Sequence, residues 1–401
     1  MTAPLRHIEI HSAGAGVTLL MAVAAGLAVS NVYYAQPLID AIGADLGLDE
    51  AVLGFVMMST QVGYGLGLIC VAPLGDLFDR RQLISAMSAG LCLALSVVFV
   101  AGHPAVFLIS MASVGVLAVV AQVIVAHAAS LAAPNQRGRI VGTVTSGIVV
   151  GILLARTVSG GLSDLFGWRS VYAASAMTEL GVAILLLRLL PAQPSRQVGV
   201  TYAALIRGFW KLFAEVPILR TRGILAFFIF FAVTTLLTPL VLPLTAPPFS
   251  YSHTVVGLFG LAGVAGAMGA VSAGRLADRG YAQLVSGVAL GIMVLSWGCA
   301  VLLPRSIWFL VIAVIAMDYG LQAVHVTNQS LIYRVRSDAQ SSLAAAYMIF
   351  YAAGSGAGSV SSTIAYATGG WEAVCILGAV VSSAGWVFWA WTRTDTSALS
   401  Q

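Results

Sequence analysis

Three ionisable side chains stand inside long apolar stretches of the sequence: Arg156, Glu179 and Asp318. A charge in apolar surroundings is costly unless it is paired or neutralised by a proton. The chemistry that these residues offer is therefore ion pairing and the uptake and release of protons. Together with His325 they form the candidate proton-coupling set.

Asp318 begins a polar stripe. Gln322, His325 and Gln329 follow it at steps of 4, 3 and 4, which places all four residues on one helix face. A polar stripe on a membrane-spanning helix is unfavourable against lipid, so we expect it to line a cavity with Asp318 as a proton carrier. The alternative is a hydrogen-bonded seam between helices that has no role in transport.

Arg156 and Glu179 flank a single turn at Gly167, the first 11 residues before it and the second 12 residues after it. At about 1.5 Å per helical residue, both lie some 17 Å from that turn. Equal depth on a helical hairpin predicts an ion pair between them or, failing that, between Arg156 and Asp318. Such a pair could be purely structural, Arg156 could bind an anionic substrate, and Glu179 alone could be a protonated residue on the lipid side.

Several apolar stretches carry aromatic and polar residues at helical spacing, most regularly from Phe227 to Thr238. Aromatic rings beside a few polar groups suit an amphipathic organic substrate, although ordinary helix packing and interfacial tyrosines give similar patterns. The candidate substrate-cavity residues are Asn31, Tyr34, Gln61, Tyr64, Gln122, Phe227, Phe231, Thr234, Thr238, Gln322, Gln329, Tyr347 and Tyr351.

Other kinds of chemistry lack a signal in the sequence. The four cysteines fall in apolar runs, and no Cys/His spacing indicates a metal site. The Gly-x-Gly fragments lie within apolar runs without the Lys-Ser/Thr of a phosphate-binding loop. Only Asp318 and His325 approach a cluster of catalytic groups. We therefore expect no catalytic residue, no metal, no cofactor and no enzymatic activity.

The elements that hold these residues must lie in a membrane. Apolar residues make up 59% of the chain and charged residues 8%, against about 25% charged in a typical soluble protein. A spanning helix needs about 20 apolar residues. Twelve segments meet this requirement, and the first is too long for a cleaved signal peptide: 14–38, 51–74, 82–101, 105–128, 140–162, 170–191, 223–245, 254–274, 282–303, 306–330, 342–366 and 372–392.

One long break, 192–222, divides the spans into two sets of six. It opens with prolines and is rich in arginine, which is typical of a linker with room for a short surface helix. The predicted organisation is all-α: a six-helix bundle over 1–191, a linker over 192–222 and a second six-helix bundle over 223–401.

Basic residues orient the chain. If the N-terminus is inside, 16 of the 19 Lys and Arg residues fall on the inner side and two on the outer side, with Arg156 in a span. This asymmetry predicts that both termini and the linker are cytoplasmic. It also explains the net charge of +4 without nucleic acid as a partner. We expect a multi-pass protein of the bacterial inner membrane, surrounded by lipid.

The two halves repeat each other. Asp76 and Asp278 are 202 positions apart, Trp168 and Trp371 are 203 apart, and Gln122 and Gln322 are 200 apart, at the same place in each half. Two parallel six-helix repeats with a substrate site between them are a known transporter plan. The Gly147-x-x-x-Gly151 spacing could indicate a dimer, but we expect it to serve contact between the halves of a monomer.

The loop residues after the second and eighth spans carry a family resemblance. The pattern Gly-x-x-x-Asp-Arg-x-Gly-Arg-Arg of the major facilitator superfamily is matched at Asp76, Arg80 and Arg81, and more closely by Gly274 to Arg279. The fifth span resembles the Gly-rich motif of antiporters, with Arg156 at the position of its proline. The chain thus resembles the bacterial drug/proton antiporters with twelve spans.

This resemblance implies a mechanism and a gate. Spans one, four, seven and ten would line a central cavity. Asp76 would cap the eleventh span and Asp278 the fifth, with Arg80, Arg81 and Arg279 reinforcing a cytoplasmic gate. Alternatively, these charges only set the topology.

We expect proton-coupled export of small, amphipathic, possibly drug-like organic molecules by alternating access. An importer or exchanger of a metabolite is the alternative, and a membrane sensor or integral enzyme is a more distant one.

Overall fold

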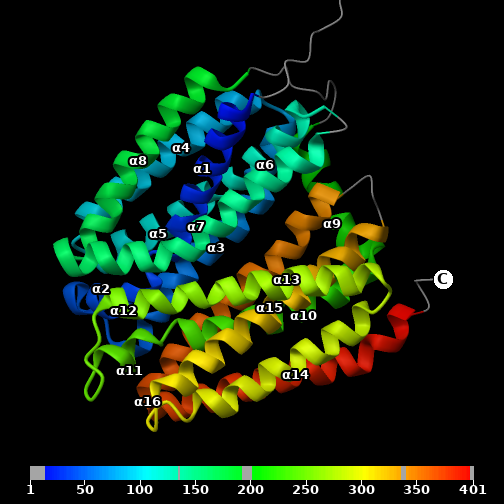
Figure 1. The fold of residues 1–401 in the computed structure, drawn as a ribbon. Helices are drawn as coiled ribbons and strands as arrows, with labels where there is room; N and C mark the ends of the chain where they lie inside the picture. The colour runs from blue at the N-terminus through cyan, green and yellow to red at the C-terminus, as the bar shows by residue number, and fades with distance from the viewer. Residues whose placement is uncertain (1–13, 134–135, 192–200, 336–339, 398–401) are drawn as a thin grey trace, which may run out of the picture.

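The computed structural model of this protein describes residues 14–133, 136–191, 201–335 and 340–397. All the regular secondary structure of these residues is helical, and turns and loops connect the helices (Figure 1). The elements are α1 Ala15–Tyr33, η1 Gln36–Leu38, α2 Ile39–Leu46, η2 Glu50–Val52, α3 Gly54–Cys70, η3 Ala72–Asp76, α4 Arg80–Val100, α5 Pro104–Ala118, α6 Val120–Leu131, α7 Arg137–Phe166, α8 Trp168–Leu189, α9 Tyr202–Glu215, α10 Pro217–Leu237, α11 Val241–Thr245, α12 His253–Leu258, η4 Phe259–Ala262, α13 Gly263–Asp278, α14 Ala282–Ala300, α15 Ile307–Val335 and α16 Gln340–Ser397.

The predicted number of spans is confirmed. Eleven helical segments among the described residues are long and apolar enough to cross a membrane. One of them, α16, consists of two helices, because the backbone of Gly369 and Gly370 is not helical. The φ angle of Gly370 is +63°, a conformation that glycine adopts without a steric penalty. The twelfth span begins directly after this break.

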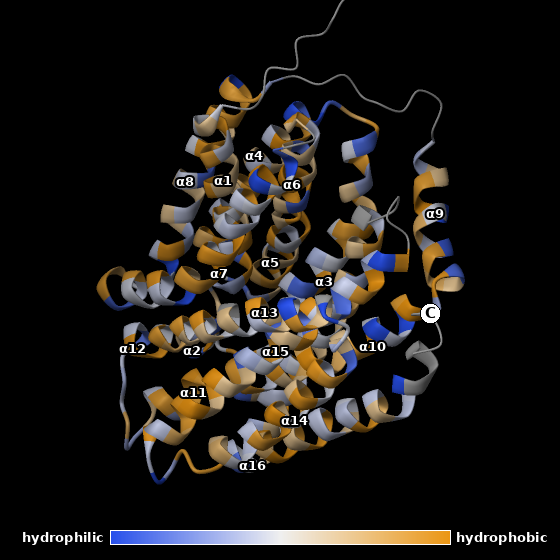
Figure 2. Cartoon of the chain, turned by 45° about the vertical axis from the view of Figure 1, so that its right-hand side comes forward, coloured by the Kyte–Doolittle hydropathy of each residue, from blue (hydrophilic) through white to orange (hydrophobic). Residues whose placement is uncertain are grey.

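The surface of both bundles is apolar, as a lipid environment requires. Hydrophobic residues are found along all of the labelled helices in Figure 2, and many of the large ones are exposed. Leu295 is 75% exposed and Leu93 is 67% exposed. In water each such side chain would forgo about 1.5–3 kcal/mol of burial free energy, whereas lipid removes that loss.

The two halves repeat the same helix packing. In the first half α1 packs along α7, α3 along α5 and α4 along α8. In the second half α10 packs along the first part of α16, α13 along α15 and α14 along the second part of α16. In both halves the first span packs along the fifth, the second along the fourth and the third along the sixth. This correspondence confirms two parallel six-helix repeats.

Glycines permit a close helix crossing between α1 and α7 in the first half. A Cβ atom on Gly147 would lie 2.2 Å from the carbonyl oxygen of Ala22, and one on Gly151 would lie 2.3 Å from that of Gly26. The Gly-x-x-x-Gly spacing therefore joins α7 to α1 within one half. The prediction that it serves contact between the halves is wrong, because the spacing reveals a close approach but not the partner.

The linker contains the short surface helix for which the sequence has room. The Thr201 hydroxyl caps α9 by accepting a hydrogen bond from the Ala204 N–H, and Phe209 and Leu212 are buried against the second half. The seventh span begins at Pro217, before the predicted start at residue 223. Proline at the first helical position favours this start, so Arg222 belongs to α10 and not to the linker.

The halves meet closely at one end of the molecule. We call the end that carries α9 the linker end and the end that carries α2, α11 and α12 the α12 end (Figure 1). At the α12 end, α12 of the second half lies along α7 of the first half. A Cβ atom on Gly160 would stand 2.2 Å from the carbonyl oxygen of His253, and one on Gly257 would stand 2.3 Å from that of Arg156. Only glycine permits this approach.

Candidate substrate and coupling site

Arg156 lies at the seam between the two halves. Its Nε donates a hydrogen bond to Oε1 of Gln36 at 2.6 Å, and its guanidinium lies over the Tyr33 ring at 5.5 Å from the centroid. Gly260 of the second half approaches from the other side, so close that an added Cβ would lie 3.1 Å from the Arg156 Cβ. Arg156 is therefore held by the first half while it faces the second.

Glu179 does not pair with Arg156. Its side chain is 1% exposed, and its Oε1 accepts a hydrogen bond from Nδ2 of Asn31 at 3.2 Å. Oδ1 of the same asparagine accepts from the Ser175 hydroxyl at 2.6 Å. The predicted ion pair is wrong in this structure because equal depth fixes the height of a side chain and not its direction. The lipid-side alternative for Glu179 is also wrong, since the residue faces α1.

Asp318 lies on α15 beside the helix α13. It is 7% exposed, and an added Cβ on Gly263 would stand 3.9 Å from its Oδ2. Arg156 acts on it electrostatically across the seam, but no salt bridge of 4.0 Å or less joins the two in the described part of the chain. The second predicted pairing is thus an interaction at a distance and not a direct contact.

Aromatic and amide side chains from both halves meet at the centre of the molecule. The hydroxyls of Tyr33 and Tyr351 lie 2.7 Å apart, and Nε2 of Gln61 donates to the Tyr351 hydroxyl at 3.3 Å. Gln122 donates to the Tyr64 hydroxyl at 3.2 Å, and the rings of Phe230 and Tyr351 lie 4.4 Å apart. We call these residues the central cluster: Tyr33, Gln61, Tyr64, Gln122, Phe230 and Tyr351.

Four members of the central cluster were predicted as cavity residues, whereas Tyr33 and Phe230 were missed. Asn31 and Tyr34 were predicted as cavity residues because they lie three residues apart, yet both are buried inside the first half. The neighbouring Tyr33 points to the seam instead. A pair of adjacent tyrosines leaves the direction of each ring open until the helix is placed.

The other predicted cavity residues divide into two groups. On α15, Nδ1 of His325 lies 3.1 Å from the Tyr347 hydroxyl, whereas Gln322 lies beside α13 and Gln329 is half-buried. The second group is the α10 stripe, which consists of Phe227, Phe231, Thr234 and, directly after the helix, Thr238. It packs against α16, where Gly354 and Gly358 approach it. These contacts are typical of helix packing.

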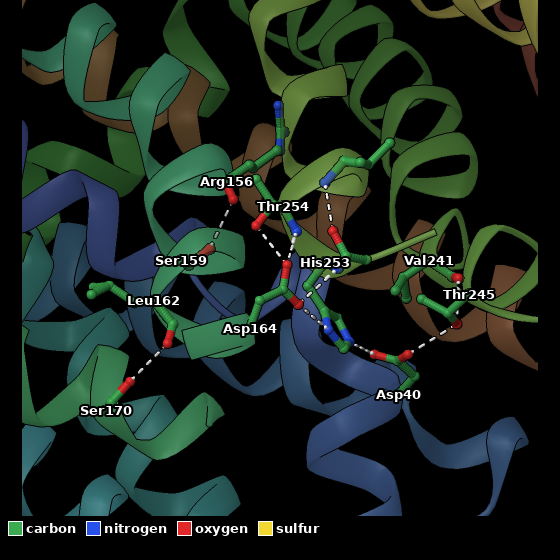
Figure 3. Close-up of polar contacts among 12 residues, drawn as sticks. Asp40, Arg156, Ser159, Leu162, Asp164, Ser170, Val241, Thr245, His253 and Thr254 are labelled. Atoms are coloured by element: carbon green, nitrogen blue, oxygen red, sulfur yellow. Dashed lines mark hydrogen bonds and ion pairs between the residues drawn. The ribbon is translucent and has the colours of Figure 1, made fainter. Parts of the chain in front are cut away.

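A hydrogen-bonded cluster that was not predicted joins the halves at the α12 end (Figure 3). Asp164 of α7 accepts hydrogen bonds from the backbone N–H groups of His253 and Thr254 at 3.1 and 2.8 Å, and from the Thr254 hydroxyl at 2.5 Å. Nε2 of His253 lies 3.0 Å from Oδ1 of Asp40, whose Oδ2 accepts from the Thr245 hydroxyl at 3.0 Å. We call these five residues the α12-end latch.

The predicted gate at the linker end has no counterpart to this latch among the described side chains. Asp76 pairs with Arg80 of its own half at 2.9 Å, and Nη1 of Arg80 donates to the Ala126 carbonyl. Arg81 donates to the Leu187 carbonyl, also in the first half. Arg279 is exposed, while the side chain of Asp278 lies outside the described residues. The capping of the fifth and eleventh spans stays a prediction.

Known proteins resemble this chain over almost its whole length. The family model of the Major Facilitator Superfamily matches residues 18–359. The putative uncharacterized transporter YgaY of Escherichia coli is 40% identical over 379 residues, covering 94% of this chain and 96% of the relative. The probable transporter SCO4007 of Streptomyces coelicolor is 28% identical, covering 94% and 86%.

A solved structure shares the fold. A bacterial homologue of the human lysosomal transporter Spinster, in an inward-facing and unoccupied conformation, superposes with a TM-score of 0.73. It covers 93% of this chain and 95% of its own, at 15% sequence identity.

Proposed function

This chain belongs to the major facilitator superfamily and is a membrane transporter of that type, and we propose that it exports small organic molecules in exchange for protons by alternating access. The observation that carries the proposal is an asymmetry between its two ends. The halves are joined by the latch at the α12 end, whereas the acid Asp76 at the linker end is paired within its own half.

This asymmetry supports one state of an alternating-access cycle. The basic residues of the loops make the linker end cytoplasmic in our proposal, in the inner membrane of a bacterium, with both termini inside. The state described here is then closed towards the outside. Closing the inside would require the first and second halves to approach at the linker end, where Asp76 could exchange Arg80 for the start of the eleventh span.

A buried carboxyl group, Asp318, and a half-buried arginine, Arg156, support coupling to protons. Asp318 and Arg156 come from opposite halves and interact across the seam beside the central cluster. A change in their separation during the cycle changes the stabilisation that Arg156 gives to the ionised carboxylate. One proton crossing ~100 mV supplies ~2.3 kcal/mol. That free energy sustains roughly a 50-fold substrate gradient.

The test is transport by inverted membrane vesicles with an imposed pH gradient. A panel of fluorescent amphipathic compounds is offered to the wild type, to Asp318→Asn and to the control Asp49→Asn, which removes an exposed acid at the α12 end. We expect gradient-driven accumulation in the wild type and the control, and none in Asp318→Asn. Accumulation by the Asp318 variant at the wild-type level would reject proton coupling through this residue. Accumulation only in right-side-out vesicles would reverse the direction and favour an importer.

A further inference from the structure

Arg222 is a buried cation that has not been assigned a role. It lies one turn into α10 at the linker end and is 1% exposed, the bulkiest of the fully buried side chains. Its Nε and Nη1 have no hydrogen-bond partner, and no salt bridge reaches it from the described residues. An arginine in this position is costly unless an anion binds to it.

The groups around Arg222 are polar and incompletely bonded. Nδ2 of Asn328 makes only long contacts of 3.4 Å, to the Arg222 carbonyl oxygen and to the Tyr347 hydroxyl, and its Oδ1 has no partner. Asn328 and Tyr347 are both fully buried. The guanidinium, the amide N–H and the phenol are all donors, and a planar oxyanion is the group that such a donor set recognises.

Acidic side chains of the chain itself do not meet this need in the described structure. Glu215 at the end of α9 is exposed. Asp318 lies on α15 ten residues from Asn328, which corresponds to about 15 Å along a helix. Tyr347 belongs to a buried apolar cluster of the same helices, which also contains Leu219, Ala226, Ile332, Leu343 and Ala346.

A continuous line of contacts connects Arg222 to the central cluster. Tyr347 lies 3.1 Å from Nδ1 of His325, whose ring stands edge-on to Phe230 at 5.4 Å. Phe230 in turn packs on Tyr351 of the central cluster. The partly exposed His325 lies between Tyr347 and Phe230. One layer of side chains therefore separates Arg222 from the central cluster.

We propose that Arg222, assisted by Asn328 and Tyr347, binds the carboxylate of an amphipathic organic anion whose apolar part contacts the central cluster. The substrate class would then be organic monocarboxylates. This inference rests on the proposed transport function and deepens it. A guanidinium–carboxylate pair neutralises the buried cation and supplies an acceptor to Nε or to Nη1, the two guanidinium nitrogens that have no partner among the described residues.

The test is thermal stabilisation of the purified protein in detergent, which needs no gradient. Acetate, benzoate and 2-naphthoate are each compared with the corresponding neutral amide at equal ionic strength. We expect the carboxylates, and 2-naphthoate most, to raise the melting temperature of the wild type, while the amides do not. Arg222→Met should weaken the apparent affinity for 2-naphthoate at least tenfold, and Arg220→Met, which removes an exposed arginine of the same helix, should leave it unchanged.

Stability without the ligand gives a second readout. Because Arg222→Met removes an unpaired buried charge, it should melt no lower than the wild type in buffer without carboxylates. If this variant does not fold, Arg222→Lys keeps the charge, loses the guanidinium and should weaken the carboxylate effect. The proposal is overturned if the wild type shows no selectivity for carboxylates over amides, or if the Arg222 variants retain it fully. Either result leaves the Asp318 transport test unaffected.

Discussion

Asp164→Ala is expected to open the α12 end. Asp164 belongs to the first half, and all four of its hydrogen-bond donors belong to the second half. They are the backbone N–H groups of His253 and Thr254, the Thr254 hydroxyl and Nδ1 of His253. Alanine removes all four interactions. In a state open at this end, the carboxylate would be hydrated by water instead, so the substitution destabilises the closed state selectively.

The free energy that Asp164→Ala removes from the closed state follows from the interactions of Asp164. Loss of an N-terminal helix cap costs about 0.5–2 kcal/mol. The contact with His253 is partly exposed, with side chains 21% and 24% accessible, so it contributes at most ~1 kcal/mol. A total of ~0.5–3 kcal/mol corresponds to a shift of roughly 2- to 150-fold towards the state that is open at the α12 end.

The assay is a distance distribution between spin labels at the α12 end. The labels replace Phe166 in the first half and Trp308 in the second, which are 73% and 70% exposed, after the four native cysteines have been removed. We expect the Asp164 variant to populate longer distances than the wild type.

Asp45→Ala is the matched control, because Asp45 binds Arg169 at the same end but within the first half. An unchanged distribution in Asp164→Ala, or an equal shift in the Asp45 control, would refute the latch.

Two further predictions concern His253 and the α1–α7 crossing. The two ring nitrogens of His253 lie 3.0 Å from Asp40 and 3.1 Å from Asp164, and only the protonated ring can donate to both carboxylates. The same labels should therefore report a more closed α12 end at about pH 5.5 than at about pH 8, and His253→Gln should abolish the difference. Gly151→Ala places a Cβ 2.3 Å from the Gly26 carbonyl oxygen and should destabilise the protein by about 1–3 kcal/mol. Gly142→Ala, in open space on the same helix, should leave the melting temperature unchanged; equal losses in both variants would contradict the argument.

The sequence predicts the architecture well because hydropathy and the repeat are properties of single segments. Twelve spans, the surface helix of the linker and the two halves all follow from composition along the chain. The boundary error at α10 has a specific cause. Arg220 and Arg222 resemble linker residues, yet Pro217 starts a helix before them, and a buried arginine is indistinguishable in sequence from one in a loop.

The site is predicted less completely because it depends on directions that spacing does not determine. The predicted cavity residues Gln61, Tyr64, Gln122 and Tyr351 lie together in the central cluster, and their role as a substrate cavity stays a prediction. Their equal distance from the turn predicts one depth for Arg156 and Glu179, but Arg156 faces the second half and Glu179 faces α1. The latch was missed because Asp40, Asp164 and His253 lie near helix ends, where charged residues are common.

The position of Arg156 on α7 connects the latch to the coupling site. Asp164 lies eight residues further along the same helix, about 12 Å away, and glycines fix α7 against α1. When the latch opens, α7 must leave α12, and Arg156 then moves away from Asp318 together with it. A buried carboxylate that loses its cation is costly, and a proton from the α12 side can neutralise it. In the proposed mechanism, closure returns Arg156 to Asp318 and favours release of that proton at the linker end. With the linker end inside, as proposed, the proton would be taken up outside and released inside, which is the direction that the proposed export by exchange requires.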